Sequence, residues 1–423
     1  QIYRQPPVGA ERPGAEIYGL EAAKAASVQA IVPALGDKLD YRPRTLVWNI
    51  ARDEGRFKLD LMQDDAVTSV TVDRVILATG AVDRALPFPG WTLPGVFTLG
   101  AAQIALKSQG VAIGRRVALI GAGPLLPLIV TQYMAAGIKP VVALDMPPLA
   151  PQFTAWRGLL AEPTTAAKGA LYLLKGRFGG VGIRSGIRAI RALGKTRVTG
   201  LVYTTADGRE HNIDCDGIGA SFGLRCEAQL ADLAGCRFAF DQLTRQWQPV
   251  RDIAGRSSVA GIYLAGDGAA IGGADAAELA GERVAFAVLA DIGGAIEEGR
   301  IRVLDRRLAR QVRFRRALEA AYPFPGHMLD ALTDDTIVCR CEGVTAGALR
   351  DTIKSRGPAE VNQMKAFTRN GMGRCQGRMC AHVGAELLAR ANGGDIVVAG
   401  RQRAQAPVKP LPLTAALNVK EPT

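Results

Sequence analysis

Apolar residues in the first half of the chain fall into short continuous runs separated by glycine-rich turns. Val117–Ile120 and Val141–Leu144 have the length and composition of buried strands, and the mostly apolar Pro124–Ala136 between them has the length of a helix. This order predicts a βαβ unit over residues 116–145. Further upstream, the β-branched and apolar run Val70–Ala78 predicts one more strand that ends at a turn.

The carboxyl-terminal part predicts helices instead. Thr345 is placed to cap a helix that ends near Ser355, and two more helices are expected at about 359–368 and 382–391. Beyond residue 400 the chain is rich in proline. We expect this tail to be extended and to lie across a neighbour.

The turn of the βαβ unit has part of a dinucleotide-binding fingerprint. Gly121, Gly123 and Pro124 form the turn and the helix start, but Leu126 replaces the third glycine of G-x-G-x-x-G. The turn and the helix N-terminus could still bind a phosphate. Asp145 ends the second strand, where it is either a ribose-binding acid or an ordinary turn residue.

Two other segments are typical of flavoproteins with two dinucleotide-binding domains. Ala78, Thr79 and Gly80 end a strand before a proline-rich loop, and Gly266-Asp267 ends a second strand before Gly273 and an alanine-rich helix. This order around a βαβ insertion is that of a flavin site. The alternative for Asp267 is an ordinary cap of the following helix.

The cysteines supply a second chemistry. Cys339, Cys341, Cys375 and Cys380 follow a C-x-C-x33-C-x4-C pattern, the number of thiolates that holds a 2Fe-2S cluster. Zinc is the alternative, although structural zinc favours C-x2-4-C pairs. Basic residues that would offset the charge of a cluster surround the set: Arg340, Lys365, Arg369, Arg374 and Arg378. The other three cysteines, Cys215, Cys226 and Cys236, are expected to be inert.

The motifs Val338–Thr345 and Gly371–Cys380 resemble the bacterioferritin-associated-ferredoxin-like (BFD-like) 2Fe-2S domain. More narrowly, the chain resembles the larger flavoprotein subunit of heteromeric amino-acid dehydrogenases, a family with opine oxidases, proline and hydroxyproline dehydrogenases and hydrogen cyanide synthase. The resemblance implies an α/β flavoprotein of the pyridine nucleotide-disulfide oxidoreductase type with a C-terminal helical 2Fe-2S domain. Its cofactors would be the cluster and FAD. FMN at a subunit interface, or a nucleotide such as ATP in the second dinucleotide domain, stays open.

The resemblance also implies domain boundaries. The FAD-type domain would comprise 1–111 and 223–325, the degenerate NAD-type insertion 112–222, the BFD-like domain 326–395 and the proline-rich tail 396–423.

No first G-x-G-x-x-G motif precedes the Ala78 strand, so we expect the sequence to begin within the FAD-type domain; the alternative is that the protein does not hold FAD in the usual way. Gln1–Arg4 matches the segment after the first nucleotide-binding unit in such flavoproteins. The resemblance implies that Asp267 bonds the ribityl chain of the flavin. The expected cofactor-binding residues are Arg4, Ala78, Thr79, Gly80, Gly121, Gly123, Pro124, Gly266, Asp267 and Gly273.

Composition excludes other classes of function. The 423 residues carry a net charge of +12, but arginines are scattered and aromatics few, so nucleic acid is not an expected partner. No apolar run has membrane-spanning length. We expect cytoplasmic residence, with attraction to the inner face of the membrane left open. No catalytic Ser-His-Asp or paired-carboxylate arrangement is evident.

These observations predict an electron-transferring subunit of a flavin-dependent dehydrogenase. By the resemblance, a partner β subunit with its own FAD would oxidise the C–N bond of an amino acid, imino acid or opine, and a small 2Fe-2S ferredoxin-like subunit could complete the hetero-oligomer. Two alternatives remain: an NAD(P)H-dependent reductase with the same cofactors, and a non-enzymatic metal-binding scaffold.

Overall fold

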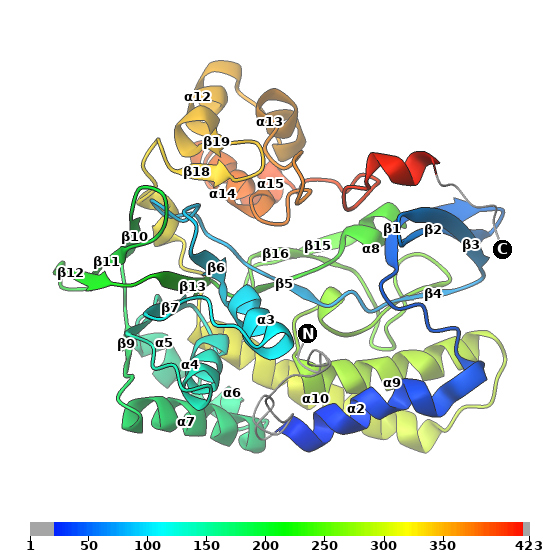
Figure 1. Cartoon of the computed structure of the whole chain (residues 1–423). Helices are drawn as coiled ribbons and strands as arrows, with labels where there is room; N and C mark the ends of the chain where they lie inside the picture. Colours follow the sequence, from blue (N-terminus) through cyan, green and yellow to red (C-terminus); the bar gives the residue numbers. More distant parts are fainter. Residues whose placement is uncertain (1–20, 418–423) are drawn as a thin grey trace. The chain divides into compact units, whose positions relative to one another are not determined.

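The computed structural model describes residues 21–417 (Figure 1). The chain divides into two compact units. Unit 1 comprises residues 1–41, 83–223 and 316–337. Unit 2 comprises residues 42–82, 224–315 and 338–423. Each unit is therefore assembled from segments that lie far apart in the sequence.

Unit 1 is built on a five-stranded sheet in the order β6-β13-β7-β8-β9, in which every pair is parallel. Its strands are β6 (Val96–Thr98), β7 (Val117–Gly121), β8 (Val142–Asp145), β9 (Ile183–Ser185) and β13 (Gly217–Ser221). Every residue of β7 is buried. Parallel sheets need cover on both faces, which explains the continuous apolar runs of these strands.

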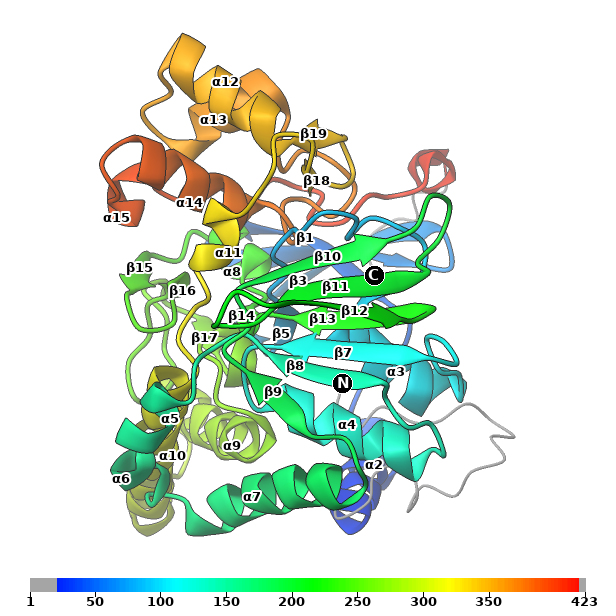
Figure 2. The same ribbon diagram turned by 90° about the vertical axis from the view of Figure 1, so that its left-hand side faces the viewer.

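Helices α3 (Leu99–Gln109), α4 (Leu125–Ala135) and α7 (Pro163–Phe178) pack in this unit, and Figure 2 shows α4 and α7 next to β8 and β9. Thr98 caps α3 by accepting a hydrogen bond from the Ala101 amide. The predicted βαβ unit over residues 116–145 is confirmed as β7, α4 and β8.

A three-stranded antiparallel sheet completes the strands of unit 1: β10 (Ala189–Leu193), β11 (Gly200–Thr204) and β12 (Glu210–Asp214). Its other helices are α2 (Ala22–Leu35), η2 (Gly36–Lys38), α5 (Ala150–Thr154), α6 (Trp156–Leu159) and α11 (His327–Asp330). Strand β5 (Ala81–Asp83) lies at a boundary of the units.

Unit 2 contains an antiparallel sheet of β1 (Leu46–Asp53), β2 (Arg56–Gln63) and β3 (Ala66–Val72). It also contains the parallel pair β4 (Val75–Leu77) with β17 (Ile262–Leu264) and the hairpin β15 (Phe238–Asp241) with β16 (Gln246–Pro249). One buried core joins these elements, and it includes Phe57, Leu77 and Leu264.

The single strand predicted over Val70–Ala78 is wrong. The structure has two strands there, because the chain leaves β3 at Asp73 and Arg74 and enters β4, which pairs with β17 in another sheet. Arg56 in β2 donates a hydrogen bond to Asp73 and holds this bend. The hydrophobic pattern does not reveal the break, since both strands continue the same apolar run.

The remaining elements of unit 2 are mostly helical. They are β14 (Leu224–Cys226), α8 (Gln229–Leu233), η3 (Gly266–Gly268), α9 (Ala274–Asp291), β18 (Ile337–Cys339), β19 (Val344–Thr345), α12 (Ala346–Arg356), α13 (Val361–Thr368), α14 (Ala381–Ala391), α15 (Ile396–Ala399), η4 (Leu413–Leu417) and α10 (Glu298–Ala321), whose last residues belong to unit 1.

In Figure 1, α12 to α15 gather around the β18–β19 ribbon. Thr345 caps α12 as predicted, by accepting a hydrogen bond from the Ala348 amide, and Gly357 ends that helix in the left-handed conformation. The segment predicted as a proline-rich tail begins with the short helix α15.

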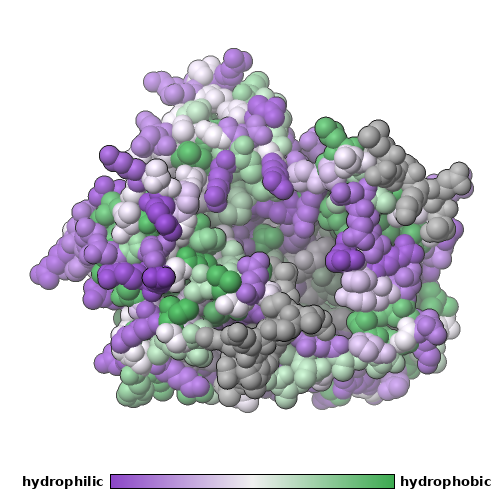
Figure 3. Space-filling model, viewed as in Figure 1, coloured by the Kyte–Doolittle hydropathy of each residue, from purple (hydrophilic) through white to green (hydrophobic). Residues whose placement is uncertain are grey.

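The surface drawn in Figure 3 interleaves hydrophilic and hydrophobic residues. Among residues 21–417, no helix combines the length and the hydropathy that crossing a bilayer requires.

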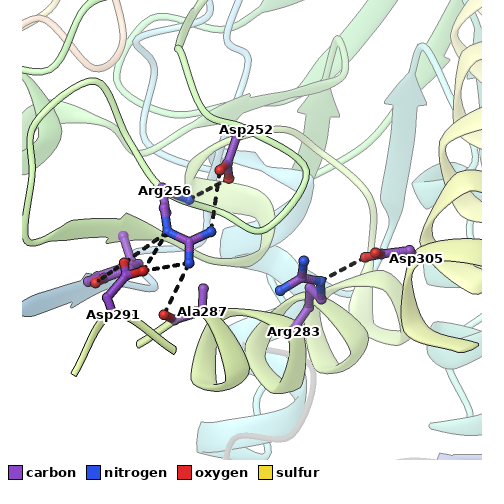
Figure 4. Close-up of polar contacts among 7 residues, drawn as sticks. Asp252, Arg256, Arg283, Ala287, Asp291 and Asp305 are labelled. Carbon is purple, nitrogen blue, oxygen red and sulfur yellow. Dashed lines mark hydrogen bonds and ion pairs between the residues drawn. The ribbon is translucent and has the colours of Figure 1, made fainter. Parts of the chain in front are cut away.

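An ion-pair network fixes the end of α9 in unit 2 (Figure 4). The Arg256 guanidinium donates to both carboxylate oxygens of Asp291 and to the Ala287 carbonyl, and the Tyr263 hydroxyl donates to Asp291 at 2.7 Å. The hydrogen bond from Arg256 and then that from Tyr263 lower the pKa of Asp291 from its usual value of 3.8 to about 2.

We expect Asp291→Asn to lower the free energy of unfolding at pH 7 by about 1 kcal/mol, because the pair is partly exposed and screened by solvent. The carboxylate has a lower pKa in the folded state, so its contribution is complete above about pH 4 and is lost as the pH falls toward 2. Urea unfolding of both proteins at pH 7 and pH 3 measures the difference. Asp64→Asn is the control, since Asp64 lies 3.6 Å from Arg44 in an exposed pair. An equal loss of unfolding free energy in Asp291→Asn and Asp64→Asn would contradict the assignment of this stabilisation to the Arg256–Asp291 pair.

Candidate functional site

The two segments expected to line a flavin site meet at one edge of unit 2. Strands β4 and β17 pair in parallel, with Leu264 opposite Leu77, so their carboxyl ends lie side by side. The Ala78–Gly80 turn follows one strand and η3 follows the other. A Cβ added at Gly268 would lie 2.4 Å from the Thr79 hydroxyl oxygen, which shows how closely the two turns approach. Ligands of α/β sheets bind at this edge.

Asp267 lies in the loop that leads into α9. Its Oδ1 accepts hydrogen bonds from the amides of Gly272 at 2.8 Å and Gly273 at 2.9 Å. Gly273 has a φ of +87° and open space where a Cβ would be, as does Gly80 with a φ of +76°. The loop is therefore held by Asp267 and leaves room above its glycines. Arg4 lies outside the described residues.

A surface hollow of about 580 Å³ lies at the opposite end of the same strands. Arg74, Gly261 and Tyr263 line it, next to the Asp291 network. Since Arg74 and Gly261 immediately precede β4 and β17, the hollow is at the amino edge and is separate from the flavin edge.

The βαβ turn of unit 1 keeps its glycines, but Leu126 fills the space beside Gly121. A Cβ at Gly121 would approach Leu126 Cβ to 3.0 Å, and Leu126 itself is buried in the core of the unit. Gly123 has a φ of +132° with open space beside it, and Pro124 precedes α4 at the N-cap position. Leu126 thus packs as a core residue where the fingerprint has a glycine.

Asp145 is buried below this turn. Gln152 Nε2 donates to its carboxylate at 3.4 Å, and burial, opposed by that bond and one from the Gly123 amide, raises its pKa to about 7. The carboxyl group therefore holds the turn against the end of β8. This arrangement agrees with the turn-residue alternative for Asp145.

The four candidate cluster cysteines come together in unit 2. Cys339 ends β18, Cys341 follows it, Cys375 lies in the loop after α13, and Cys380 directly precedes α14. Hydrogen bonds between their side chains link Cys339 to Cys380, Cys380 to Cys375, and Cys375 to Cys341. The spacing of the motif therefore brings four sulfur atoms into one group.

The electrostatics of this group lower the pKa of two cysteines and raise that of the other two. Hydrogen bonding to the Cys380 thiol lowers the pKa of Cys339 to about 6 and that of Cys375 to about 5, against the opposing effect of burial. The same bonds, with Cys380 as donor, raise the pKa of Cys380. Partial burial raises the pKa of Cys341. Because the thiolate is the form that binds metal, two ligands are already poised for it.

The backbone of the loop lets two cysteine-bearing segments approach closely. A Cβ at Gly373 would lie 2.3 Å from Cys341 Cβ, so only glycine allows the two segments to approach. Within residues 21–417, no set of three or more His, Cys, Asp or Glu side chains is arranged to hold a metal ion. The four thiols linked in a row are the donors that a 2Fe-2S cluster takes.

Two of the five basic residues expected to offset the cluster charge pair with carboxylates instead. Arg369 donates to Glu342 at 2.7 Å, and Arg378 makes a bidentate pair with Glu227. Lys365 is buried, which lowers its pKa, whereas Arg340 and Arg374 are exposed.

Glu227 was not found by sequence reasoning. It follows β14, and its amide donates to the Gly80 carbonyl at 3.0 Å while its carbonyl accepts a hydrogen bond from the Thr79 hydroxyl. No motif marks this residue, since a lone glutamate after a strand is usually solvated. Only the tertiary structure shows that it lies at the turn.

Comparison with protein families agrees with this geometry. The BFD-like 2Fe-2S binding domain matches residues 337–390, and the pyridine nucleotide-disulphide oxidoreductase family matches residues 9–142. The crystal structure of L-proline dehydrogenase from P. horikoshii superposes with a TM-score of 0.67 at 20% identity, covering 92% of this chain and 68% of that chain.

Similar proteins extend over most of the sequence. The A subunit of opine oxidase from Rhizobium meliloti is 37% identical over 386 residues, which is 89% of this chain and 73% of the relative. The HcnB subunit of hydrogen cyanide synthase from Pseudomonas protegens is 30% identical, with 86% and 79% of the two chains covered. These matches confirm the predicted fold class and the predicted cofactors, a 2Fe-2S cluster and FAD.

We expect the purified chain to contain about two irons and two acid-labile sulfides, as this cluster type requires. Cys375→Ser should abolish the visible absorption of the cluster, whereas Cys215→Ser should leave it intact because Cys215 lies in unit 1. Metal and sulfide analysis measures both. One zinc per chain without sulfide would contradict the assignment.

Gly268→Ala should lower the flavin content, because its Cβ would displace the Thr79 hydroxyl from the flavin edge. Asp267→Ala should do the same by releasing the Gly272–Gly273 loop. Gly281→Ala in α9 is the control, since a Cβ there meets nothing within 4 Å. Flavin per chain is read by absorbance after denaturation, with the cluster spectrum unchanged. Full flavin content in both test variants would remove this edge from the site.

Proposed function

The chain belongs to the family that includes the A subunit of opine oxidase and the HcnB subunit of hydrogen cyanide synthase, and from this premise we propose that it is the electron-transferring subunit of a heteromeric flavin-dependent dehydrogenase. The substrate would be an opine, an amino acid or an imino acid, oxidised at a C–N bond on a partner subunit.

One observation carries the proposal: a flavin-type strand edge and a four-thiol loop lie within the same compact unit. Ala78–Gly80 and Gly266–Gly268 form the edge, and Cys339, Cys341, Cys375 and Cys380 form the thiol group. A flavin and an iron–sulfur centre together convert a two-electron oxidation into one-electron transfers.

The residues of the chain would have distinct tasks in this scheme. The two glycine turns leave space for the flavin, and Asp267 holds the loop before α9. The N-terminus of α9 would favour negative charge near it. Cys339, Cys341, Cys375 and Cys380 would hold the iron–sulfur cluster.

The lettered subunits of the relatives support a hetero-oligomer. We propose a catalytic β subunit that carries its own FAD, and a further component of the complex that is a small 2Fe-2S ferredoxin-like protein. The domains of this chain would be the FAD-type domain 1–111 and 223–325, the NAD-type insertion 112–222, the BFD-like domain 326–395 and the tail 396–423.

The chain alone should not oxidise an amino acid, whereas the assembled complex should. The test compares the purified chain with the reconstituted complex on proline, hydroxyproline, glycine and opines, using a dye as electron acceptor. The chain should still pass electrons from dithionite to the dye, which serves as the positive control.

Turnover by the single chain near the rate of the complex would place the substrate site here and contradict the division of labour. Anaerobic NADH is a further arm of this experiment. Rapid flavin bleaching by NADH would favour the alternative of an NAD(P)H-dependent reductase.

A further inference from the structure

We propose that Glu227 and Arg378 are positioning residues that join the flavin edge to the cysteine loop and set the charge between them. This inference rests on the proposed function, because it takes Ala78–Gly80 as part of the flavin site and Cys375 and Cys380 as cluster ligands. All of these residues belong to unit 2.

The backbone amide and the backbone carbonyl of Glu227 both form hydrogen bonds with the Ala78–Gly80 turn. Its amide donates to the Gly80 carbonyl at 3.0 Å, and its own carbonyl accepts from the Thr79 hydroxyl. Since Gly268 leaves room for Thr79 only by lacking a side chain, the Thr79 hydroxyl has little freedom to move. Any displacement of Glu227 must therefore displace the turn.

The side chain of Glu227 reaches the cysteine loop. Arg378 Nε lies 2.5 Å and its second nitrogen 3.0 Å from the two carboxylate oxygens, the planar geometry that fixes orientation as well as distance. The side chains of Arg378 and Glu227 are only 14% and 17% exposed, so water weakens the pair little. Arg378 also donates to the Cys375 carbonyl at 3.3 Å and the Val408 carbonyl at 2.7 Å.

The neighbours of Glu227 reinforce the same contact. Arg225 donates to the Arg378 carbonyl at 3.3 Å and lies 3.1 Å from His382 Nδ1, while Gln229 donates to the Gln376 carbonyl at 2.6 Å. Residues 225, 227 and 229 thus present alternate side chains to the segment around Cys375 and Cys380. Within this row, Glu227 both forms an ion pair with Arg378 and bonds the Ala78–Gly80 turn through its backbone.

The link has an electrostatic consequence. The paired charges cancel, so removal of one partner leaves the other uncompensated in a poorly solvated place. An uncompensated arginine stabilises the reduced, more negative cluster and raises its midpoint potential, whereas an uncompensated glutamate lowers it. A pair that served only to hold the loop would shift the potential in the same direction whichever partner was lost.

The first experiment measures the cluster midpoint potential of the holoprotein by EPR-monitored redox titration. Glu227→Gln should raise the potential and Arg378→Gln should lower it. The double variant should return close to the wild-type value, because both charges are gone. Shifts of one sign in both single variants, or no shift in either, would overturn the proposal.

The second experiment changes one site and observes the other. Arg378→Gln in the cysteine loop should speed hydrogen exchange in peptides that contain residues 78–80 and 227 by about tenfold, the effect of losing one hydrogen bond to a charged group. Arg245→Gln is the matched control, since Arg245 makes a bidentate pair at 2.9 Å with Glu386, a residue in the middle of α14. Equal exchange at residues 78–80 in the two variants would contradict the link.

A conservative variant covers the case in which Arg378→Gln fails to bind the cluster. Arg378→Lys keeps the charge but loses the fork, so it should keep the potential near the wild-type value and still speed exchange at residues 78–80. If residues 78–80 of Arg378→Lys exchanged hydrogen as slowly as in the wild type, the proposed connection between Arg378 and the Ala78–Gly80 turn would be contradicted. If the wild-type chain itself held no cluster or no flavin, the proposed function would fail instead, and analysis of cofactor content distinguishes that outcome.

Discussion

The parallel pairing of β4 with β17 is the constraint on which the arrangement of unit 2 depends. Ile262 pairs with Val75 and Leu264 with Leu77, although more than 180 residues separate the two strands. Because parallel strands end at the same edge, the turns that follow them are brought together by this pairing. The pairing is stabilised by burial, since Val75, Leu77, Ile262 and Leu264 all enter one core.

Close contact between those turns then limits what else can occupy the edge. Gly268 admits the Thr79 hydroxyl, and Thr79 in turn bonds the carbonyl of Glu227. A chain of contacts therefore leads from the strand pair to the residue that reaches the cysteine loop. The packing of Gly268 against Thr79 therefore affects the position of Glu227, and through Glu227 the position of the cysteine loop.

Local patterns were sufficient for several elements, among them β7, α4, β8 and α12. The continuous apolar runs at Val117 and Val142 predicted β7 and β8 because strands buried on both faces need no alternation. The four cysteines were predicted as cluster ligands from their number and spacing. Thr345 was identified as a cap because its hydroxyl serves the first turn of its own helix.

Choices between partners far apart in sequence were not predictable in this way. Asp73 and Arg74 interrupt one apolar run because β3 and β4 join different sheets, and that choice is made by β2 and β17. Likewise Arg378 was assigned to the cluster charge, whereas Glu227 already balances it. A charge shows its partner only when both are placed in the fold.

The segment after residue 400 makes the same point about the cysteine loop. Its proline content predicted an extended tail across a neighbour, yet its described part binds its own chain. Arg401 pairs with Asp232, and Gln402 donates to the Asn370 carbonyl at 2.8 Å beside Gly371 and Gly377, whose missing side chains admit it.

Farther along the same segment, Val408 contacts two distant parts of unit 2. Its amide donates to the Trp48 carbonyl of β1, and its carbonyl accepts from Arg378. The guanidinium of Arg378 is therefore held by Glu227 on one side and by Val408 on the other. Since both supports come from segments outside the cysteine loop, the surrounding unit contributes to the orientation of that loop, together with the loop's own glycines.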